Sequence, residues 1–149
     1  MTVYVAEWTS AQNGSAAFDK VGLAPGSLAV KIVKIVVLSS TAVDVARYSS
    51  SSITGGTVLT PTPMRDGAGS PTATVKYNAT SFSGTPTYFV QNNEGWDGAP
   101  STSVPNTYTP QASLIVKSGA VFVVKNTVTP ANIAYMAIYF DEQRLQGGT

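Results

Sequence analysis

The sequence predicts an all-β fold, a sandwich of two antiparallel sheets. Valine, isoleucine and threonine recur in short runs, and glycine, proline and serine separate these runs at short intervals. Patterns typical of helices are scarce along the whole chain. Because nine short strands in 149 residues need two stacked layers to share one core, we expect a jelly roll first, or a related sandwich.

Each predicted strand is a run rich in β-branched or aromatic residues, bounded by residues that favour turns. In chain order the predicted strands are Thr2–Trp8, Ser27–Leu38, Ala42–Tyr48, Thr57–Thr60, Thr72–Asn78, Thr87–Gln91, Ser113–Lys117, Ala120–Asn126 and Asn132–Asp141.

Two short connections predict hairpins between neighbouring strands. Ser118 and Gly119 stand between two apolar runs, and the segment Leu38–Ala42 joins two others in the same way. The last strand is apolar on both faces, so we expect it to lie centrally in its sheet or to have one face against another chain. Lys31 and Lys34 fall on opposite faces of their strand, which a bulge or an edge position would accommodate.

The chain shows no internal boundary, and we expect one domain over residues 1–149. The proline- and glycine-rich stretches Thr60–Pro71 and Gly95–Pro110 are predicted to be long loops. Segment 1–24 is the expected attachment segment, and residues 146–149 are the expected loose tail.

Composition excludes several kinds of function. The chain has no cysteine and no histidine, so thiolate nucleophiles, imidazole bases and the usual zinc, copper and haem ligands are missing. Only 11% of the residues are charged and the net charge is +1, which disfavours long-range attraction to nucleic acid or to an anionic membrane. We therefore expect no nucleic-acid partner and contacts made by shape, apolar surface and neutral hydrogen bonds.

The start of the chain lacks the basic and apolar regions of a signal peptide, and the longest apolar stretch, Ile32–Leu38, is too short to cross a bilayer. Export and a membrane location are therefore not expected.

The densest polar cluster, Asn92–Asp97, contains oxygen ligands beside Trp96 and could hold calcium or a sugar ring. Its spacing matches no metal loop, and we favour a plain loop whose Trp96 folds onto the core or packs on a neighbouring subunit.

The eight acidic residues are scattered at turns and strand ends and predict no glycosidase pair. We expect no catalytic residue, no cofactor and no metal. The candidate interface or ligand-contact residues are aromatic: Trp8, Trp96, Tyr108, Tyr135 and Tyr139.

Several segments resemble a group of small β-sandwich structural proteins of tailed bacteriophages. The resemblance covers about residues 28 to 142 and rests on Val30–Val36, Ser40–Tyr48, the Gly-Gly-Thr turn within Thr54–Pro63, Pro110–Val124 and Ala134–Glu142. The late turn of that group carries an acidic residue that is missing here, where the turn is Lys117-Ser-Gly-Ala120.

The resemblance implies a virion component, a jelly-roll capsid decoration or cement subunit that associates as a homotrimer on the major capsid protein. It implies no enzymatic residue. Synthesis in the host cytoplasm and a final location in the virion follow from it. Two alternatives stay open: a host-recognition or carbohydrate-binding module of the fibre-knob type that uses Trp96 and Tyr108, and a virion component at the neck or tail.

Overall fold

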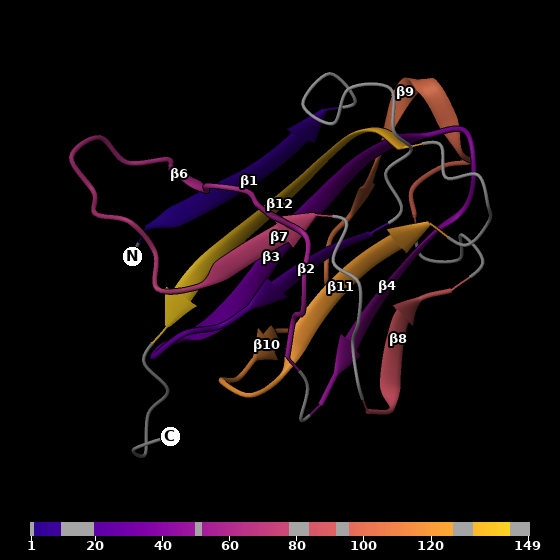
Figure 1. The fold of residues 1–149 in the computed structure, drawn as a ribbon. Coiled ribbons are helices and arrows are strands. Elements are labelled where there is room, and N and C mark those ends of the chain that lie inside the picture. The colour runs from indigo at the N-terminus through magenta and orange to yellow at the C-terminus, as the bar shows by residue number, and fades with distance from the viewer. Residues whose placement is uncertain are drawn as a thin grey trace.

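The computed structural model describes residues 2–9, 20–49, 52–77, 84–91, 96–126 and 133–143, and within these ranges the chain forms strands and no helix (Figure 1). The strands are β1 (Val3–Thr9), β2 (Lys20–Ala24), β3 (Ala29–Ser39), β4 (Val43–Tyr48), β5 (Thr57–Val58), β6 (Thr62–Pro63), β7 (Thr74–Tyr77), β8 (Pro86–Val90), β9 (Ser101–Tyr108), β10 (Leu114–Val116), β11 (Val121–Asn126) and β12 (Ile133–Gln143).

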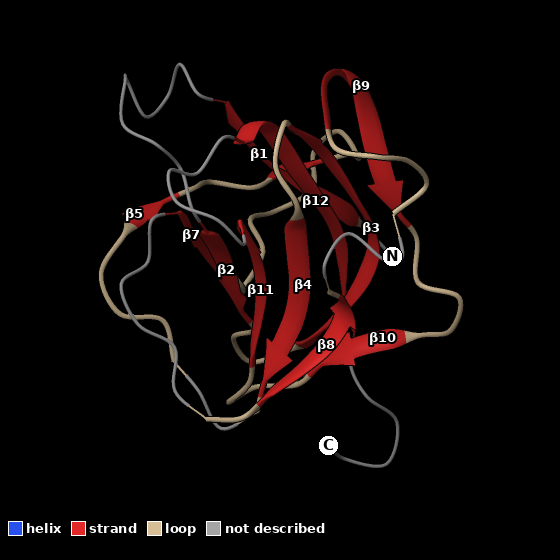
Figure 2. Cartoon of the chain, turned by 90° about the vertical axis from the view of Figure 1, so that its right-hand side faces the viewer, coloured by secondary structure: helices blue, strands red, loops and turns tan. Residues whose placement is uncertain are grey.

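The strands form two antiparallel sheets packed face to face, which confirms the predicted sandwich. Sheet A has the order β10-β3-β12-β1-β6, and β9 also pairs with β3. Sheet B has the order β5-β7-β2-β11-β4-β8 and faces the viewer in Figure 2. Alternate residues of both sheets point inward and build one core, whose largest fully buried side chains are Trp8, Phe122 and Phe140.

Eight of the strands have the connectivity of a jelly roll. Numbered one to eight in chain order, these strands are β1, β2, β3, β4, β8, β10, β11 and β12. Sheet A then contains strands 1-8-3-6 and sheet B contains strands 2-7-4-5. Successive strands therefore alternate between the two sheets almost everywhere, and most pairing partners are distant in sequence.

This alternation makes both predicted hairpins wrong. The turn at Ser118 and Gly119 exists, with the amide of Ala120 donating to the carbonyl of Lys117 over 3.1 Å and Gly119 at a φ of 90°. It nevertheless joins β10 of sheet A to β11 of sheet B, and Leu38–Ala42 likewise crosses from β3 in sheet A to β4 in sheet B. Both turns are arches between layers, because a tight turn fixes local geometry but not the sheet that receives the next strand.

The nine predicted strands each overlap an observed one, and three further strands were missed. β2 and β6 are short, and β9 occupies half of the predicted loop Gly95–Pro110. Segment 1–24 contributes β1 and β2, and its role in attachment stays a prediction. The predicted tail, 146–149, and residues 92–95 of the polar cluster lie outside the described residues.

The two long strands β3 and β12 lie side by side, and β12 is central, between β1 and β3, as predicted. Their register shifts where Tyr139 pairs with Lys34 and Phe140 pairs with Ile32, so Val33 is an extra residue. A bulge was one of the two arrangements predicted here. The extra residue shifts the alternation of inward and outward side chains by one position, so that Ile32 and Ile35 both point into the core while Lys31 and Lys34 both point outward.

Candidate functional site

The outer face of sheet A is unusually apolar for the exposed side of a sandwich. Core residues such as Ala6, Ile138 and Val37 point inward, so the residues that alternate with them point outward. The outward residues include Val5 on β1, Tyr135 and Tyr139 on β12, and Val36 and Leu38 on β3, all partly exposed. We call these five residues the tyrosine face. The solvated side of an antiparallel sheet normally carries polar residues at such positions, so this face is suited to contact with another protein.

Two polar contacts fix the tyrosines of this face. The hydroxyl of Tyr135 donates a hydrogen bond of 2.8 Å to Oε2 of Glu7, a residue 128 positions away in sequence. Burial, then the hydrogen bond and the negative charge of Glu7, raise the pKa of Tyr135 far above its ordinary value of 10.0. The ammonium group of Lys34 lies 4.7 Å from the centre of the Tyr139 ring. Both rings are therefore held in one orientation before any partner binds.

Charge is distributed unevenly across the tyrosine face. Glu7 on β1 shares a row with Ala137 and Val36, and Val5 shares the next row with Tyr139 and Lys34. The acidic group thus lies on one flank and the lysine on the other, with β12 between them. A partner that brings a base to the β1 flank and an acid to the β3 flank would complement this pattern.

The structure divides the aromatic residues singled out by the sequence among three places. Tyr135 and Tyr139 lie on the tyrosine face. Trp8 points the other way, is 0% exposed, and packs in the core with its ring centre 6.2 Å from that of Tyr77. Trp8 shares the inward phase of Tyr4 and Ala6, so as folded it offers no surface to a partner, which corrects the expectation that it contacts one.

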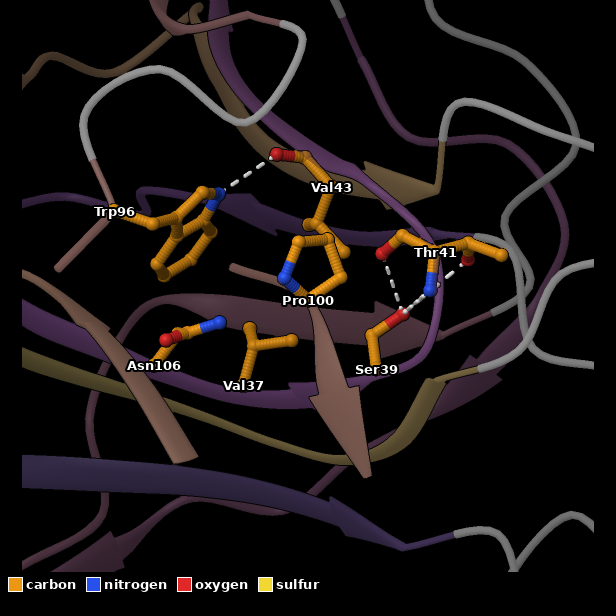
Figure 3. A pocket seen from close by; sticks show the side chains of 7 residues that line it. All are labelled: Val37, Ser39, Thr41, Val43, Trp96, Pro100 and Asn106. Carbon is orange, nitrogen blue, oxygen red and sulfur yellow. Dashed lines mark hydrogen bonds between the residues drawn. The ribbon is translucent and has the colours of Figure 1, made fainter. Parts of the chain in front are cut away.

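Trp96 and Tyr108 form the third group, and Figure 3 shows Trp96 with the residues around it. Trp96 packs against the core, and its Nε1 donates a hydrogen bond of 2.9 Å to the carbonyl of Val43. Its ring meets that of Tyr108 edge to face, with centres 6.3 Å apart. A cavity of about 10 Å³, the size of one water molecule, lies beside Trp96 and is lined also by Val37 and Asn106. Trp96 therefore packs onto the core between β3 and β4, which is the role favoured from the sequence.

The segment between Trp96 and Tyr108 is held by its own hydrogen bonds. The side-chain amide of Asn106 donates to the carbonyl of Ala99 over 2.6 Å, and the backbone amide of Thr107 donates to Oδ1 of Asp97 over 2.8 Å. Within β9 the residues between Ser101 and Asn106 project away from β3, and Val104 is 62% exposed. Burial raises the pKa of Tyr108.

The edges of both sheets are protected against pairing with another strand. β5 has two residues and β10 has three, while β6, β8 and β9 contain Pro63, Pro86 and Pro105 respectively. Proline cannot donate a backbone hydrogen bond, and very short strands give a poor template for pairing. Association through a sheet face or a loop is therefore favoured over association through a sheet edge.

Several surface residues were not singled out from the sequence. Val58, in the edge strand β5, is 60% exposed, and Met64, directly after the edge strand β6, is 61% exposed. Arg47 and Phe89 line an open groove on the opposite side of the sandwich. Glu7 and Lys34 were not expected to flank the tyrosines, because that arrangement depends on pairing between distant strands.

Within the described ranges, no three acidic residues gather in a way that could hold a metal ion, and no long apolar helix capable of crossing a bilayer is found.

Comparison of the chain with protein-family models, with curated proteins and with solved structures found no match.

Proposed function

We propose that this protein is a non-enzymatic structural subunit of a virion, one that decorates or cements a capsid surface as an oligomer. The observation that carries the proposal is the tyrosine face, an apolar and partly exposed sheet surface with pre-positioned aromatic rings. Tyrosine is enriched at protein interfaces because its ring buries a large area at little conformational cost.

The low charge of the chain supports the same proposal. With 11% charged residues and a net charge of +1, the protein is poorly suited to remain a dispersed monomer. A surface that becomes covered in an assembly removes this difficulty. The resemblance to phage structural proteins supplies the virion setting, the homotrimer and the major capsid protein as partner, and these details are part of the proposal.

Many copies on a symmetric shell would need only modest affinity each. Contacts that are weak one at a time become stable when a trimer engages several capsid sites together. The protected sheet edges fit such a role, because a subunit kept at high local concentration must not extend its sheets from copy to copy.

The proposal is tested with a charge placed on the tyrosine face. We expect the wild-type chain to be oligomeric by light scattering and to bind purified capsids that lack it, while Tyr139→Glu weakens both by about tenfold or more. Thr74→Glu is the matched control, since Thr74 is exposed on the outer side of β7 in sheet B. A monomeric wild-type chain that ignores capsids would overturn the proposal.

Cryo-electron microscopy of virions with and without the protein locates the subunit. Density over capsomer junctions, with weaker particles when the protein is missing, supports cementing. Density confined to the neck or tail overturns the capsid position.

A further inference from the structure

A groove with a volume of about 370 Å³ opens between the two sheets on the side where β8 and β10 are the edge strands. Its walls come from four strands and one loop: Arg47 of β4, Phe89 of β8, Tyr108 of β9, Leu114 of β10, and Gln111 and Ser113 of the connecting loop. We call it the Arg47 groove. Its volume falls within the range of small-molecule sites in proteins.

Among the residues that the structure describes, Arg47 is the only charged one that lines this groove, and it is held in a defined place. Its guanidinium lies 5.8 Å from the centre of the Phe89 ring, and that ring packs on the buried Phe122 with centres 6.4 Å apart. Among the described residues, no carboxylate or carbonyl accepts a hydrogen bond from the guanidinium. A half-buried arginine stacked on an aromatic ring thus offers its planar set of donors to the groove.

The remaining lining is neutral and mixed: Phe89, Pro110, Ala112, Leu114 and Ile115 are apolar, whereas Tyr108, Gln111 and Ser113 carry hydrogen-bonding side chains. Gln111 and Ser113 are exposed, and residues 109–113 belong to no strand, so their backbone groups are outside the ladders of both sheets. Tyr108 adds a ring and a hydroxyl group, and Leu114 forms an apolar floor. This wall can serve several hydroxyl groups of one ligand at once.

We propose that the Arg47 groove binds an acidic sugar, a pyranose unit that carries a carboxylate. The carboxylate pairs with Arg47 through two parallel hydrogen bonds, and the hydroxyl groups of the sugar bond to the 109–113 loop. The ring lies against Tyr108. This site is independent of the tyrosine face and adds a ligand to a subunit whose main contacts are with protein.

The lining favours a sugar over an acidic peptide. A peptide in extended form would gain most by pairing with an edge strand, but β10 has only three residues and β8 begins with Pro86. A peptide side chain would also need a deep apolar pocket as its anchor, whereas this groove is open and the loop 109–113, which forms one wall, is largely exposed.

The test is a titration of the 149-residue chain with sodium glucuronate, followed by the amide signals of a nitrogen-15-labelled sample. We expect a dissociation constant of about 1 mM, with the largest shifts at residues 108–114. Trp96 gives a second readout, since its ring contacts Tyr108, whereas Trp8 is buried elsewhere. Glucose at the same concentrations should bind about tenfold more weakly, because it lacks the carboxylate.

Two arginine variants separate the groove from general charge. Arg47→Gln should weaken glucuronate binding by about tenfold or more, and Arg65→Gln, which removes the same charge from an exposed loop, should leave it unchanged. Arg47→Lys keeps the charge but loses the planar pair of donors, and an intermediate loss is expected even if Arg47→Gln folds poorly.

Three results would overturn the proposal: equal binding of glucose and glucuronate, no binding of either, or binding of the peptide acetyl-Phe-Asp in the groove without glucuronate. None of these results depends on whether the chain binds capsids, so failure here is distinguishable from failure of the proposed function.

Discussion

The outer faces of the two sheets differ in how the chain treats its outward apolar residues. On sheet B, Ala46, Val121 and Val123 point away from the core yet are 0% exposed. Nζ of Lys125 lies 3.5 and 3.4 Å from the hydroxyls of Tyr48 and Tyr88, so its side chain crosses above the Ala46–Val123 pair. On sheet A, Ala137 is also 0% exposed, but Val5, Val36, Leu38, Tyr135 and Tyr139 stay partly exposed.

The chain's own side chains therefore cover the apolar outer face of sheet B, whereas they leave much of the outer face of sheet A partly exposed. The pKa of Lys125 reflects this covered environment. Burial lowers the pKa, but Tyr48 and Tyr88 outweigh this effect and raise the pKa overall. On sheet A, the ammonium group of Lys34 lies over the ring of Tyr139 and Glu7 accepts a hydrogen bond from Tyr135, yet both rings stay partly exposed. An apolar surface of this kind is where a partner gains most by burial.

The difference between the two faces is tested most directly by placing the same aspartate on each. Val123→Asp puts a charge in a fully buried site and should cost about 4–5 kcal/mol, a large part of the stability of an ordinary domain. Val36→Asp, on the tyrosine face, should cost about 1 kcal/mol and should instead abolish self-association. Urea unfolding and light scattering measure the two effects.

Equal destabilisation by the two variants would contradict the comparison, because it would mean that the tyrosine face is as closed as the outer face of sheet B. Thr74→Asp, on the exposed outer side of β7, serves as the control for adding a negative charge.

A second prediction concerns the contact that ties the end of β12 to the segment before β7. The carboxylate of Glu142 accepts hydrogen bonds from the amide and hydroxyl of Thr72 and from the amide of Ala73, at 2.7 to 3.0 Å. Because several donors converge on one charged group, Glu142→Ala should cost about 2 kcal/mol. This loss should appear in urea unfolding without a change in oligomeric state.

Glu142→Gln provides the matched comparison, since the amide oxygen can replace only part of the acceptor set. Its cost should be smaller than that of Glu142→Ala. A loss of self-association in either variant would show that this end of sheet A belongs to the interface rather than to the scaffold alone.

The sequence predicted elements better than partners. Alternation revealed strands such as Val43–Tyr48, because side-chain period depends only on neighbours in the chain. It could not reveal that β1 pairs with β12, and so could not bring Glu7 to Tyr135. β9 was missed because Ser101–Tyr108 lacks apolar alternation and contains Pro105, and its strand form comes from pairing with β3.

The candidate residues show the same limit. Trp8 could have been assigned to the core, since it shares the phase of Tyr4 and Ala6 on a strand whose other face carries Glu7. The Arg47 groove could not have been found, because its walls come from both sheets and adjoin only after the sandwich closes. Local pattern therefore predicts which residues point together on one strand, and topology decides what they meet.

The smallest expected effect concerns Tyr135 at alkaline pH. Because the pKa of Tyr135 is raised above its ordinary value of 10.0 in the folded chain, the folded state holds the phenolic proton more tightly than the unfolded state does. The stability this provides is fully present below pH 10 and is lost as the pH rises beyond it. Tyr135→Phe cannot lose a proton there.

The melting temperature of the wild type should thus fall between pH 9 and pH 11 by a few degrees more than that of Tyr135→Phe. Some alkaline loss should persist in the variant, since the pKa values of Tyr108 and Lys125 are also raised. If the two proteins lost stability in parallel, the ring of Tyr135 would be as solvated in the folded chain as in the unfolded one. The tyrosine face would then hold a freely exposed phenol rather than a ring fixed against Glu7, and the contrast with the covered outer face of sheet B would rest on Tyr139 alone.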